Sequence, residues 1–167
     1  MTSTSHPTPV TRRATPQDAA AIQALIDRYV SSGTLLPRSQ EFITLNIQDF
    51  IVATVADQIV GCVHLDEYAP SLSELRSLAV HPDWQGAGIG RLLVHATEQL
   101  ARKRDHTTLF AVSNDEEFFH KFGFETRHIP ELDLERSEVS RYKGVYAKDL
   151  APTTSSVQID QKGSAHP

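Results

Sequence analysis

The sequence predicts an α/β fold in one domain, with a central mixed β-sheet flanked by helices. Two runs rich in β-branched residues, joined by a short turn, predict an early antiparallel hairpin. Later in the chain, short apolar runs alternate with helical periodicity in a β-α-β-α-β order, which is typical of a mixed sheet. The 167 residues, 40% of them hydrophobic and 22% charged, can build one core, and the sequence holds no internal repeats.

The two ends of the chain differ in composition from its middle. Residues 1–9 and 151–167 are rich in Ser, Thr and Pro and show no apolar periodicity. Such composition is typical of flexible tails. The alternative for the C-terminal tail is that it packs along a partner. We therefore expect the folded domain to extend from residue 10 to residue 150.

Composition excludes several classes of protein. The net charge of −5 argues against a nucleic-acid-binding surface, which is normally basic. A single cysteine excludes an intramolecular disulfide and a zinc cluster, and we expect no metal site. No apolar run approaches the ~20 residues that span a bilayer, and the N-terminus does not resemble a signal peptide. We expect a cytoplasmic protein that binds neither nucleic acid nor membrane.

The first half of the chain predicts two helices and then the hairpin. Thr15, with Pro16 after it, is typical of a helix start, and the residues that follow at helical spacing are Ile22, Leu25, Ile26, Tyr29 and Val30. Ser39 is expected to cap a second helix that carries Phe42, Ile43 and Ile47. The hairpin strands are FIVATVA (50–56) and IVGCVHL (59–65), with the turn at Asp57-Gln58.

The second half predicts the alternating pattern. ELRSLAV (74–80) is a strand and HPDWQGAGIG (81–90) a loop. The helix after it has an apolar face made of Ile89, Leu92, Leu93, Ala96 and Leu100. TLFAV (108–112) is a short buried strand, EEFFHKF (116–122) a short helix ended by Gly123, and VYAKDL (145–150) the last strand.

The glycine-rich segment 85–90 is the most informative part of the sequence. Glycines between a strand and a helix let the backbone turn tightly, and they leave N–H groups free to point at an anion near the helix N-terminus. A P-loop is excluded, because Gly90 is followed by Arg91 and Leu92 instead of Lys and Ser or Thr. The dinucleotide fingerprint is also excluded, because Arg91 stands where its third glycine belongs. A flexible loop would explain the glycines alone equally well.

In its context this segment resembles a known family. LAVHPDWQGAGIGRLLV (78–94) is similar to motif A of the GNAT N-acetyltransferases, and SNDEEFFHKFGF (113–124) resembles the second signature of that superfamily. The resemblance covers roughly residues 12–150. It implies a GNAT-like fold whose central sheet splays apart, and acetyl-CoA as the acetyl donor, transferred directly to an amine without an enzyme nucleophile. Cys62, in an apolar strand, is therefore expected to be a buried structural thiol.

The resemblance also implies the cofactor-binding residues. Backbone groups of Leu78, Ala79 and Val80 would pair with the pantetheine arm as an added strand does. Backbone N–H groups of the loop would hold the pyrophosphate, and the arginine after the loop, Arg91, would add a positive charge. The loop residues are Gln85, Gly86, Ala87, Gly88, Ile89 and Gly90.

Acetyl transfer needs a base and an acid. An amine with a pKa near ~8–10 is mostly charged at neutral pH, so a carboxylate must take its proton. Glu74 stands where the family often places that base, with a solvated strand-end acid as the alternative. Many family members use a tyrosine in the short helix as the acid, but Phe118-Phe119 occupies that place here, which excludes tyrosine in this role. Ser113 is the nearest hydroxyl, although a strand-end serine is usually a turn residue.

One subgroup is similar in more detail. GTLLPRS (33–39), Glu41, and Ile47 with Phe50 resemble the acetyltransferase domain of N-acetylglutamate synthase, as do ELRSLAV and LFAVS. The resemblance implies catalysis by Glu74 and Ser113 and substrate carboxylates held by Arg38, the Ser77 backbone, Arg136 and Arg141. Guanidinium groups bind carboxylates bidentately, whereas the alternative for each arginine is a solvated surface residue.

Two departures from the subgroup keep alternatives open. Larger synthases carry a kinase-like domain for arginine feedback, for which we expect no room here, and Asp115 stands where the subgroup keeps an arginine. We expect acetyl-CoA-dependent acetylation of an amino acid's α-amine, with L-glutamate leading. The alternatives are another small amine and a non-catalytic module that binds acyl-CoA. The oligomeric state stays open, with a homodimer among the options.

Overall fold

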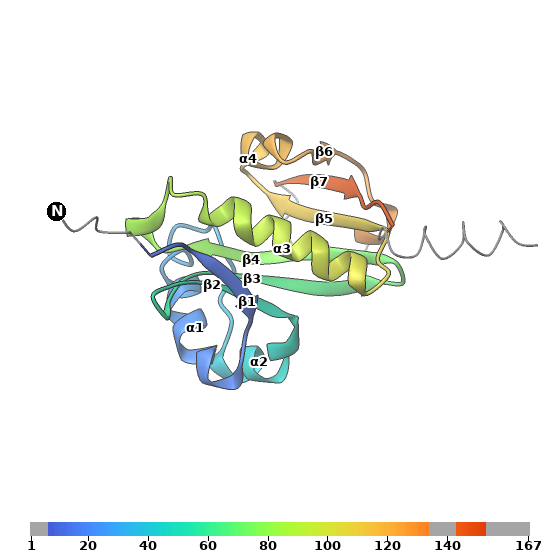
Figure 1. Ribbon diagram of the computed structural model, residues 1–167. Helices are drawn as coiled ribbons and strands as arrows, with labels where there is room; N and C mark the ends of the chain where they lie inside the picture. Colours follow the sequence, from blue (N-terminus) through green and yellow to red (C-terminus); the bar gives the residue numbers. More distant parts are fainter. Residues whose placement is uncertain (1–6, 134–142, 153–167) are drawn as a thin grey trace, which may run out of the picture. The chain divides into compact units, whose positions relative to one another are not determined.

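The computed structural model describes residues 7–133 and 143–152. Their strands form one mixed sheet in the order β1-β2-β3-β4-β5-β7-β6 (Figure 1). The strands are β1 (Val10–Arg13), β2 (Phe50–Val55), β3 (Gln58–Ala69), β4 (Leu72–Val80), β5 (Thr108–Ser113), β6 (Glu125–Thr126) and β7 (Gly144–Asp149). The α-helices are α1 (Ala19–Asp27), α2 (Gln40–Leu45), α3 (Ile89–Lys103) and α4 (Glu116–Lys121).

The chain divides into two compact units. The first consists of the residues up to Asp66 together with Leu75–Thr97, and the second of Glu67–Glu74 together with the residues from Glu98 onward. The strands β3 and β4 and the helix α3 each continue from one unit into the other. The domain boundaries expected at residues 10 and 150 stay a prediction.

The predicted hairpin is present in the first unit, with a small shift at its turn. β2 pairs antiparallel with β3 from Phe50 opposite His64 to Val55 opposite Gln58. The two turn residues are Ala56 and Asp57, both at positive φ (47° and 65°). A two-residue turn with both central φ angles positive matches the twist of paired strands. The turn expected at Asp57-Gln58 is therefore wrong by one residue, because alanine is an unusual residue for the left-handed conformation.

Helices cover both faces of this hairpin. Along a strand, neighbouring residues point to opposite faces. Cys62 belongs to a core on one face, where the other buried members include Ile22 and Ile26 of α1, Ile43 of α2, and Phe50 and Val52 of β2. Gly61 points the other way, where a Cβ would lie 2.9 Å from side-chain atoms of Ile89 and Leu93 in α3. Within the first unit, α1 and α2 therefore cover one face and α3 the other (Figure 1).

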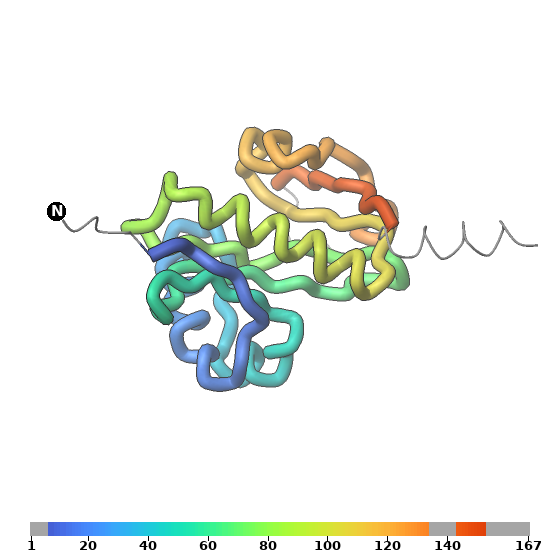
Figure 2. Tube along the Cα trace, in the orientation of Figure 1, coloured from blue at the N-terminus to red at the C-terminus, as the bar shows by residue number. Residues whose placement is uncertain are grey.

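The helix starts follow the sequence closely, while the helix ends do not. Ser39 caps α2 as predicted, since its Oγ accepts the Phe42 N–H at 3.0 Å. Ile47 lies beyond α2, in a short 3₁₀ helix. A 3₁₀ turn over Pro16–Asp18 precedes α1, and α1 ends at Asp27, so Tyr29 and Val30 follow the helix instead of belonging to it. Figure 2 traces this path from β1 through α1 and α2 into β2.

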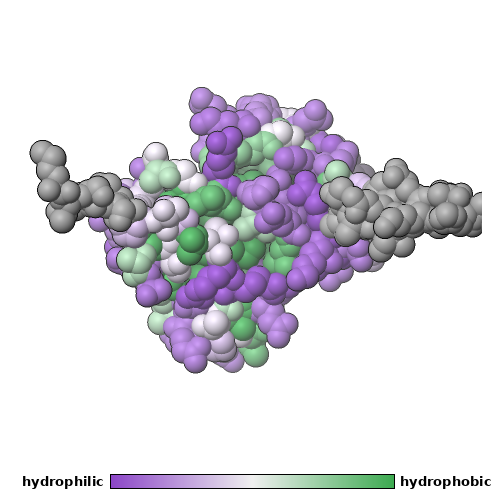
Figure 3. Space-filling model, viewed as in Figure 1, coloured by the Kyte–Doolittle hydropathy of each residue, from purple (hydrophilic) through white to green (hydrophobic). Residues whose placement is uncertain are grey.

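The predicted apolar face of α3 is wrong at one residue, Leu92. Ile89, Leu93 and Leu100 are buried, but Leu92 is 36% exposed. The buried stripe of the helix extends toward Val94, Thr97 and Ala101, which leaves Leu92 outside it. In Figure 3, green hydrophobic surface accordingly appears where the first half of α3 reaches the surface.

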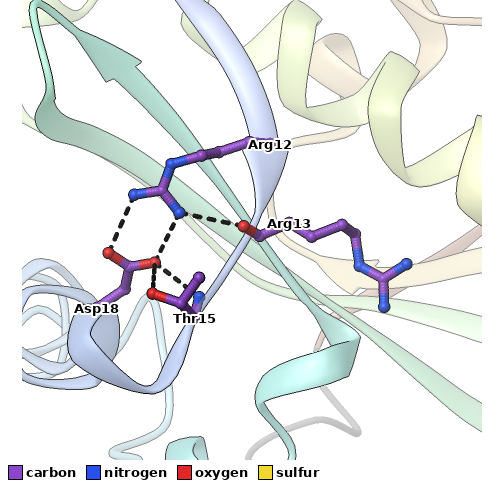
Figure 4. A network of polar contacts seen from close by, with 4 residues as sticks. All are labelled: Arg12, Arg13, Thr15 and Asp18. Atoms are coloured by element: carbon purple, nitrogen blue, oxygen red, sulfur yellow. Dashed lines mark hydrogen bonds and ion pairs between the residues drawn. The ribbon is translucent and has the colours of Figure 1, made fainter.

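β1 is a strand that the sequence did not predict. It pairs antiparallel with β2, from Val10 opposite Thr54 onward. Its end is fixed by Asp18, whose carboxylate accepts two hydrogen bonds from the Arg12 guanidinium (2.7 and 3.0 Å) and one from the Thr15 N–H (2.7 Å) (Figure 4). The Arg12 hydrogen bonds lower the pKa of Asp18 to about 2. This network ties the edge strand to the start of the first helical segment.

The second unit is built on β5 and β7. β5 is parallel to β4 over three pairs, the last being Glu74 with Phe110, and antiparallel to β7 from Thr108 opposite Asp149 to Ser113 opposite Gly144. The two-residue strand β6, which was not predicted, pairs with β7. Buried apolar residues of this unit include Leu72, Phe110, Ile129, Leu132, Val145 and Ala147.

An ion pair fixes the end of α4 in the second unit. The Lys148 ammonium donates to a Glu98 carboxylate oxygen and to the Phe122 carbonyl, both at 2.9 Å. Glu98 is 5% exposed, so this pair satisfies a nearly buried charge. Across the described ranges, no helix combines the length and the apolar character that crossing a bilayer requires.

Candidate active site

The glycine loop leads from β4 into α3. A 3₁₀ turn over Pro82–Trp84 is capped by His81, whose Nδ1 accepts the Asp83 N–H at 3.1 Å. Gly86 and Gly88 then take positive φ angles of 83° and 82°. A Cβ at either glycine would meet no atom within 4 Å. Glycine is therefore needed here for the backbone conformation, and the loop has open space beside it.

Not all predicted N–H groups of the loop are available to a ligand. The Gln85 N–H already donates to the Pro82 carbonyl (3.4 Å), and the Ala87 N–H donates to the Trp84 carbonyl (3.3 Å). The first N–H groups of a helix have no preceding helical carbonyl, and its N-terminus carries positive partial charge. The donors that fit an anion are therefore those of Gly86, Gly88, Ile89, Gly90 and Arg91.

The end of β4 is irregular in the first unit. Ser77 is 8% exposed and takes a positive φ of 53° inside the strand. Leu78 and Val80 are half-buried, and Ala79 between them is buried. The Val80 carbonyl already accepts the Tyr29 hydroxyl, and that same hydroxyl accepts the Gln85 side-chain amide at 2.8 Å. Tyr29 thus joins the end of β4 to the first residue of the glycine loop, a role that helical periodicity could not indicate.

Arg38 is held beside an aromatic ring in the first unit. Its guanidinium lies 5.3 Å from the centre of the Phe42 ring, and the residue is half-buried. The Ser39 cap fixes the backbone between them. The other two predicted carboxylate-binding arginines, Arg136 and Arg141, lie outside the described residues.

Glu74 and Ser113 belong to neighbouring strands of the second unit. Glu74 is half-buried and pairs with Phe110. Ser113 lies three residues beyond Phe110, about 10 Å along β5, and therefore points to the face opposite to that of Phe110. The Ser113 Oγ accepts the Asp115 N–H at 3.0 Å, as a turn serine does. Its O–H remains a donor. Asp115 caps α4, because its carboxylate accepts the Phe118 N–H at 3.1 Å.

Cys62 is buried, as predicted. It has no exposed surface, and its Sγ contacts the Ser77 carbonyl at 3.6 Å. Burial raises the pKa of the thiol to about 12. A thiol that stays protonated at neutral pH is a poor nucleophile, which agrees with a structural role for Cys62. Among the residues described, no three His, Cys, Asp or Glu side chains gather in a way that could hold a metal ion.

His64 is a residue of this region that sequence reasoning missed. It is 1% exposed, its ring stacks on Phe50 with centroids 4.4 Å apart, and it contacts Phe42 edge-on at 5.9 Å. Burial lowers its pKa to about 4. The alternation of the hairpin strand, which places His64 on the same face as Cys62, could have revealed a buried histidine.

Comparison with known proteins defines the class to which this fold and loop belong. Residues 46–126 match the model of the acetyltransferase (GNAT) domain family. The chain is 36% identical over 113 residues to an uncharacterized N-acetyltransferase of Chlorobaculum tepidum. The aligned region covers 68% of this chain and 73% of that protein. The chain therefore belongs to the GNAT acetyltransferases and is an acetyl-CoA-dependent N-acetyltransferase.

Two further relatives are described more specifically. An amino-acid acetyltransferase of Mycobacterium tuberculosis is 35% identical over 119 residues, covering 70% of this chain and 68% of that one. The crystal structure of N-acetylglutamate synthase from Neisseria gonorrhoeae, complexed with coenzyme A and N-acetyl-glutamate, superposes with a TM-score of 0.76 at 27% identity. That match covers 88% of this chain and 36% of the synthase.

Proposed function

We propose that the chain acetylates the α-amine of an amino acid, with L-glutamate as the leading candidate. That reaction is the first step of arginine biosynthesis. The observation that carries the proposal is the half-buried Arg38 guanidinium over the Phe42 ring, in the segment that resembles N-acetylglutamate synthase. The names of the Mycobacterium and Neisseria relatives support the same substrate class.

Arg38 has the chemistry that a carboxylate requires. A guanidinium presents two parallel N–H groups to the two carboxylate oxygens, and stacking on an aromatic ring keeps its plane oriented. The Ser77 backbone, turned by its positive φ, is the predicted second contact. Arg136 and Arg141 stay predicted ligands of the second carboxylate.

The donor would be bound by backbone groups of the first unit. The N–H groups of Gly86, Gly88 and the first turn of α3 fit a pyrophosphate, and Arg91 adds a positive charge. The backbone of Leu78 to Val80 would pair with the pantetheine arm. The bound donor supplies the acetyl group as a thioester.

Glu74 and Ser113 are the proposed catalytic residues. Glu74 would take a proton from the substrate ammonium, directly or through water, which frees the nitrogen lone pair for attack on the thioester carbonyl. Ser113 would stabilise the departing end of the donor through its O–H. Asp115, the departure from the synthase pattern, is engaged as the cap of α4. Its charge therefore has a structural role, and it does not by itself argue for a cationic substrate.

A panel of amines tests the proposal. Purified protein is incubated with acetyl-CoA and each amine, and release of the free thiol is followed with a thiol reagent. We expect glutamate to have the highest kcat/KM, with glutamine below it and basic amino acids far lower. A neutral or basic amino acid that is turned over faster than glutamate would contradict the glutamate assignment.

The base is tested by Glu74→Gln, which keeps the size of the side chain and removes the carboxylate. The expected loss in kcat is about 10²–10⁴-fold, the usual contribution of a general base. Acetyl-CoA affinity should stay near that of the wild type. Glu117→Gln, an exposed change on α4, is the matched control and should leave kcat unchanged. A Glu74→Gln variant with wild-type turnover would remove Glu74 from the mechanism.

A further inference from the structure

The guanidinium that the proposed function assigns to a substrate carboxylate is carried by a short segment of the first unit. Arg38 directly precedes Ser39, the cap of α2, and α2 has six residues, of which only Ile43 is buried. A helix of this length is not stable without packing against other elements. The direction of the Arg38 side chain therefore depends on the few contacts that hold α2 in place.

Phe42 is the residue of α2 that contacts Arg38. The guanidinium lies 5.3 Å from the centre of the Phe42 ring, a distance at which a cation is attracted to the face of an aromatic ring. The backbone of Phe42 is fixed, because its N–H donates to the Ser39 Oγ (3.0 Å) and its carbonyl accepts the Asn46 side-chain amide (2.8 Å). Its side chain is only half-buried, so the direction of the ring depends on the rings that contact it.

His64 connects this ring to the core. The His64 and Phe42 rings meet edge-on, with centroids 5.9 Å apart and planes at 86°. On β2, Phe50 pairs directly with His64, has no exposed surface and stacks on the imidazole with centroids 4.4 Å apart. Phe50, His64 and Phe42 thus form an aromatic row that leads from the β2–β3 pair to α2, and Arg38 lies against the last ring.

The contacts within the aromatic row depend on the direction of each ring. Aromatic side chains attract one another in stacked and edge-on arrangements, and rotation of the His64 ring would break both of its contacts. His64 is 1% exposed and has little room to rotate. It therefore fixes the plane of Phe42, and that plane is the surface against which the Arg38 guanidinium lies.

His64 takes part in the aromatic row as an uncharged ring. Burial is the main cause that lowers its pKa to about 4. Among the charged groups around it, Asp66 and Asp49 raise this pKa. Arg76 and Arg38 lower it. A protonated imidazole would place a second positive charge near the Arg38 guanidinium, whereas the neutral ring does not repel it.

We propose that His64 is a positioning residue for the amino-acid substrate, because through Phe42 it holds the Arg38 guanidinium in the orientation that receives the substrate carboxylate. The side chains involved all belong to the first unit. His64 does not itself contact the substrate, since both of its ring nitrogens are buried. The proposal rests on the role of Arg38 in the proposed function.

The first test is His64→Ala, which removes the middle ring of the aromatic row. We expect KM for the amino acid to rise about 10- to 100-fold, because a misplacement of about 1 Å in a positioning group can cost up to about 10²-fold. The values of kcat and of KM for acetyl-CoA should stay near those of the wild type, as they do when binding common to the ground state and the transition state is lost. Wild-type KM in folded His64→Ala would overturn the proposal.

His64→Phe separates the contribution of the ring from that of its nitrogen atoms. Phenylalanine restores a flat ring between Phe50 and Phe42, so KM for the amino acid should return close to the wild-type value. If His64→Phe is as impaired as His64→Ala, the imidazole nitrogens contribute to binding directly and the positioning role is wrong.

Val52→Ala is the matched control for a general loosening of this core. Val52 is buried, belongs to the same cluster as Phe50 and contributes no ring to the aromatic row. The variant should lower the unfolding midpoint, as the loss of buried methyl groups does, and leave KM for the amino acid unchanged. An equal rise in KM in Val52→Ala would attribute the effect to packing alone and contradict the proposal.

A double-mutant cycle tests whether His64 acts through Arg38. Arg38→Ala alone should raise KM for the amino acid, and the addition of His64→Ala should raise it no further. Effects that multiply in the double variant would rule out this route. If His64→Ala does not fold, Phe42→Leu interrupts the aromatic row at a half-buried position and should raise KM in the same way, and wild-type KM in Phe42→Leu would overturn the proposal.

Each assay uses the amine that the wild type turns over fastest, so that the possible failures can be told apart. Failure of the glutamate assignment would appear in the wild-type panel. Failure of Arg38 as a carboxylate ligand would appear as wild-type KM in Arg38→Ala and would overturn the role of His64 with it. Failure of the role of His64 alone would appear as wild-type KM in His64→Ala while KM in Arg38→Ala is raised.

Discussion

At the scale of single residues, His64 is the least expected feature of the first unit. Its ring is buried between Phe50 and Phe42, and neither ring nitrogen has a hydrogen-bond partner among the described residues. A buried polar group without a partner costs stability. Its pKa is lowered to about 4 mainly by burial; Asp66 opposes this shift and Arg76 adds to it. His64 is therefore neutral in the folded protein at neutral pH.

This environment predicts a pH-dependent stability. The folded pKa of His64 is about 4, below its ordinary value of 6.5. The unfolded chain therefore takes up a proton as the pH falls through 6.5, whereas the folded chain does so only near 4. Stability is complete above about pH 6.5 and is lost as the pH falls toward 4, by up to about 3 kcal/mol.

Urea unfolding of the wild type and of His64→Phe at pH 7 and pH 5 measures this effect. The variant keeps an aromatic ring beside Phe50 and should lose the dependence on pH in this window. Asp18, with a pKa of about 2, stays ionised at both values and does not contribute. His95→Asn, a change at an exposed position of α3, should behave as the wild type does. An unchanged pH dependence in His64→Phe would refute the assignment.

At the scale of elements, the sequence predicted those whose signals are local. The β2–β3 hairpin has two β-branched runs beside each other, α2 has its Ser39 cap, and α3 has a long apolar period. β1 was missed because three of its four residues are exposed, so it carries no alternation and exists only through pairing with β2. The positive φ of Ser77 inside β4 also has no signature in the residue itself.

Substitution of two glycines of the first unit should affect different properties: the free energy of unfolding at Gly61 and acetyl-CoA binding at Gly88. Gly61→Ala places a methyl group 2.9 Å from Ile89 and Leu93, which are buried and have little room to move. We expect a loss of about 1–3 kcal/mol in the free energy of unfolding, the usual cost of overpacking. A Cβ at Gly88 would meet no atom within 4 Å, but valine there must adopt a positive φ.

The strain in Gly88→Val falls on the exposed loop, so we expect acetyl-CoA binding to weaken by more than ~2 kcal/mol with only a small change in the unfolding midpoint. Calorimetric titration measures the binding and thermal unfolding the stability of both variants. Unchanged acetyl-CoA affinity in folded Gly88→Val would contradict the role of the loop.

At the scale of the whole molecule, the candidate residues come from distant parts of the chain. The glycine loop and Glu74 could be proposed from the sequence because a motif surrounds each of them. The place of Ser113 opposite Gly144 could not, because it depends on the register of β5 against β7. Register is set by packing across the sheet, so no local pattern contains it.

The continuity of three elements through both compact units predicts how the molecule unfolds. Strands β3 and β4 and helix α3 each begin in one unit and end in the other. Unfolding of either unit therefore breaks backbone hydrogen bonds in elements that also belong to the second of the two units. We therefore expect one cooperative thermal transition, with equal calorimetric and van't Hoff enthalpies.

Trp84 is the only tryptophan of the chain and lies in the first unit, so its fluorescence reports that unit, whereas far-ultraviolet circular dichroism reports helices and strands of both. The two midpoints should coincide in the wild type, and circular dichroism of Trp84→Phe should show whether the probe itself affects stability. A fluorescence midpoint several degrees from the dichroism midpoint would mean that the units unfold separately, because a shared strand can transmit cooperativity only if it melts as a whole.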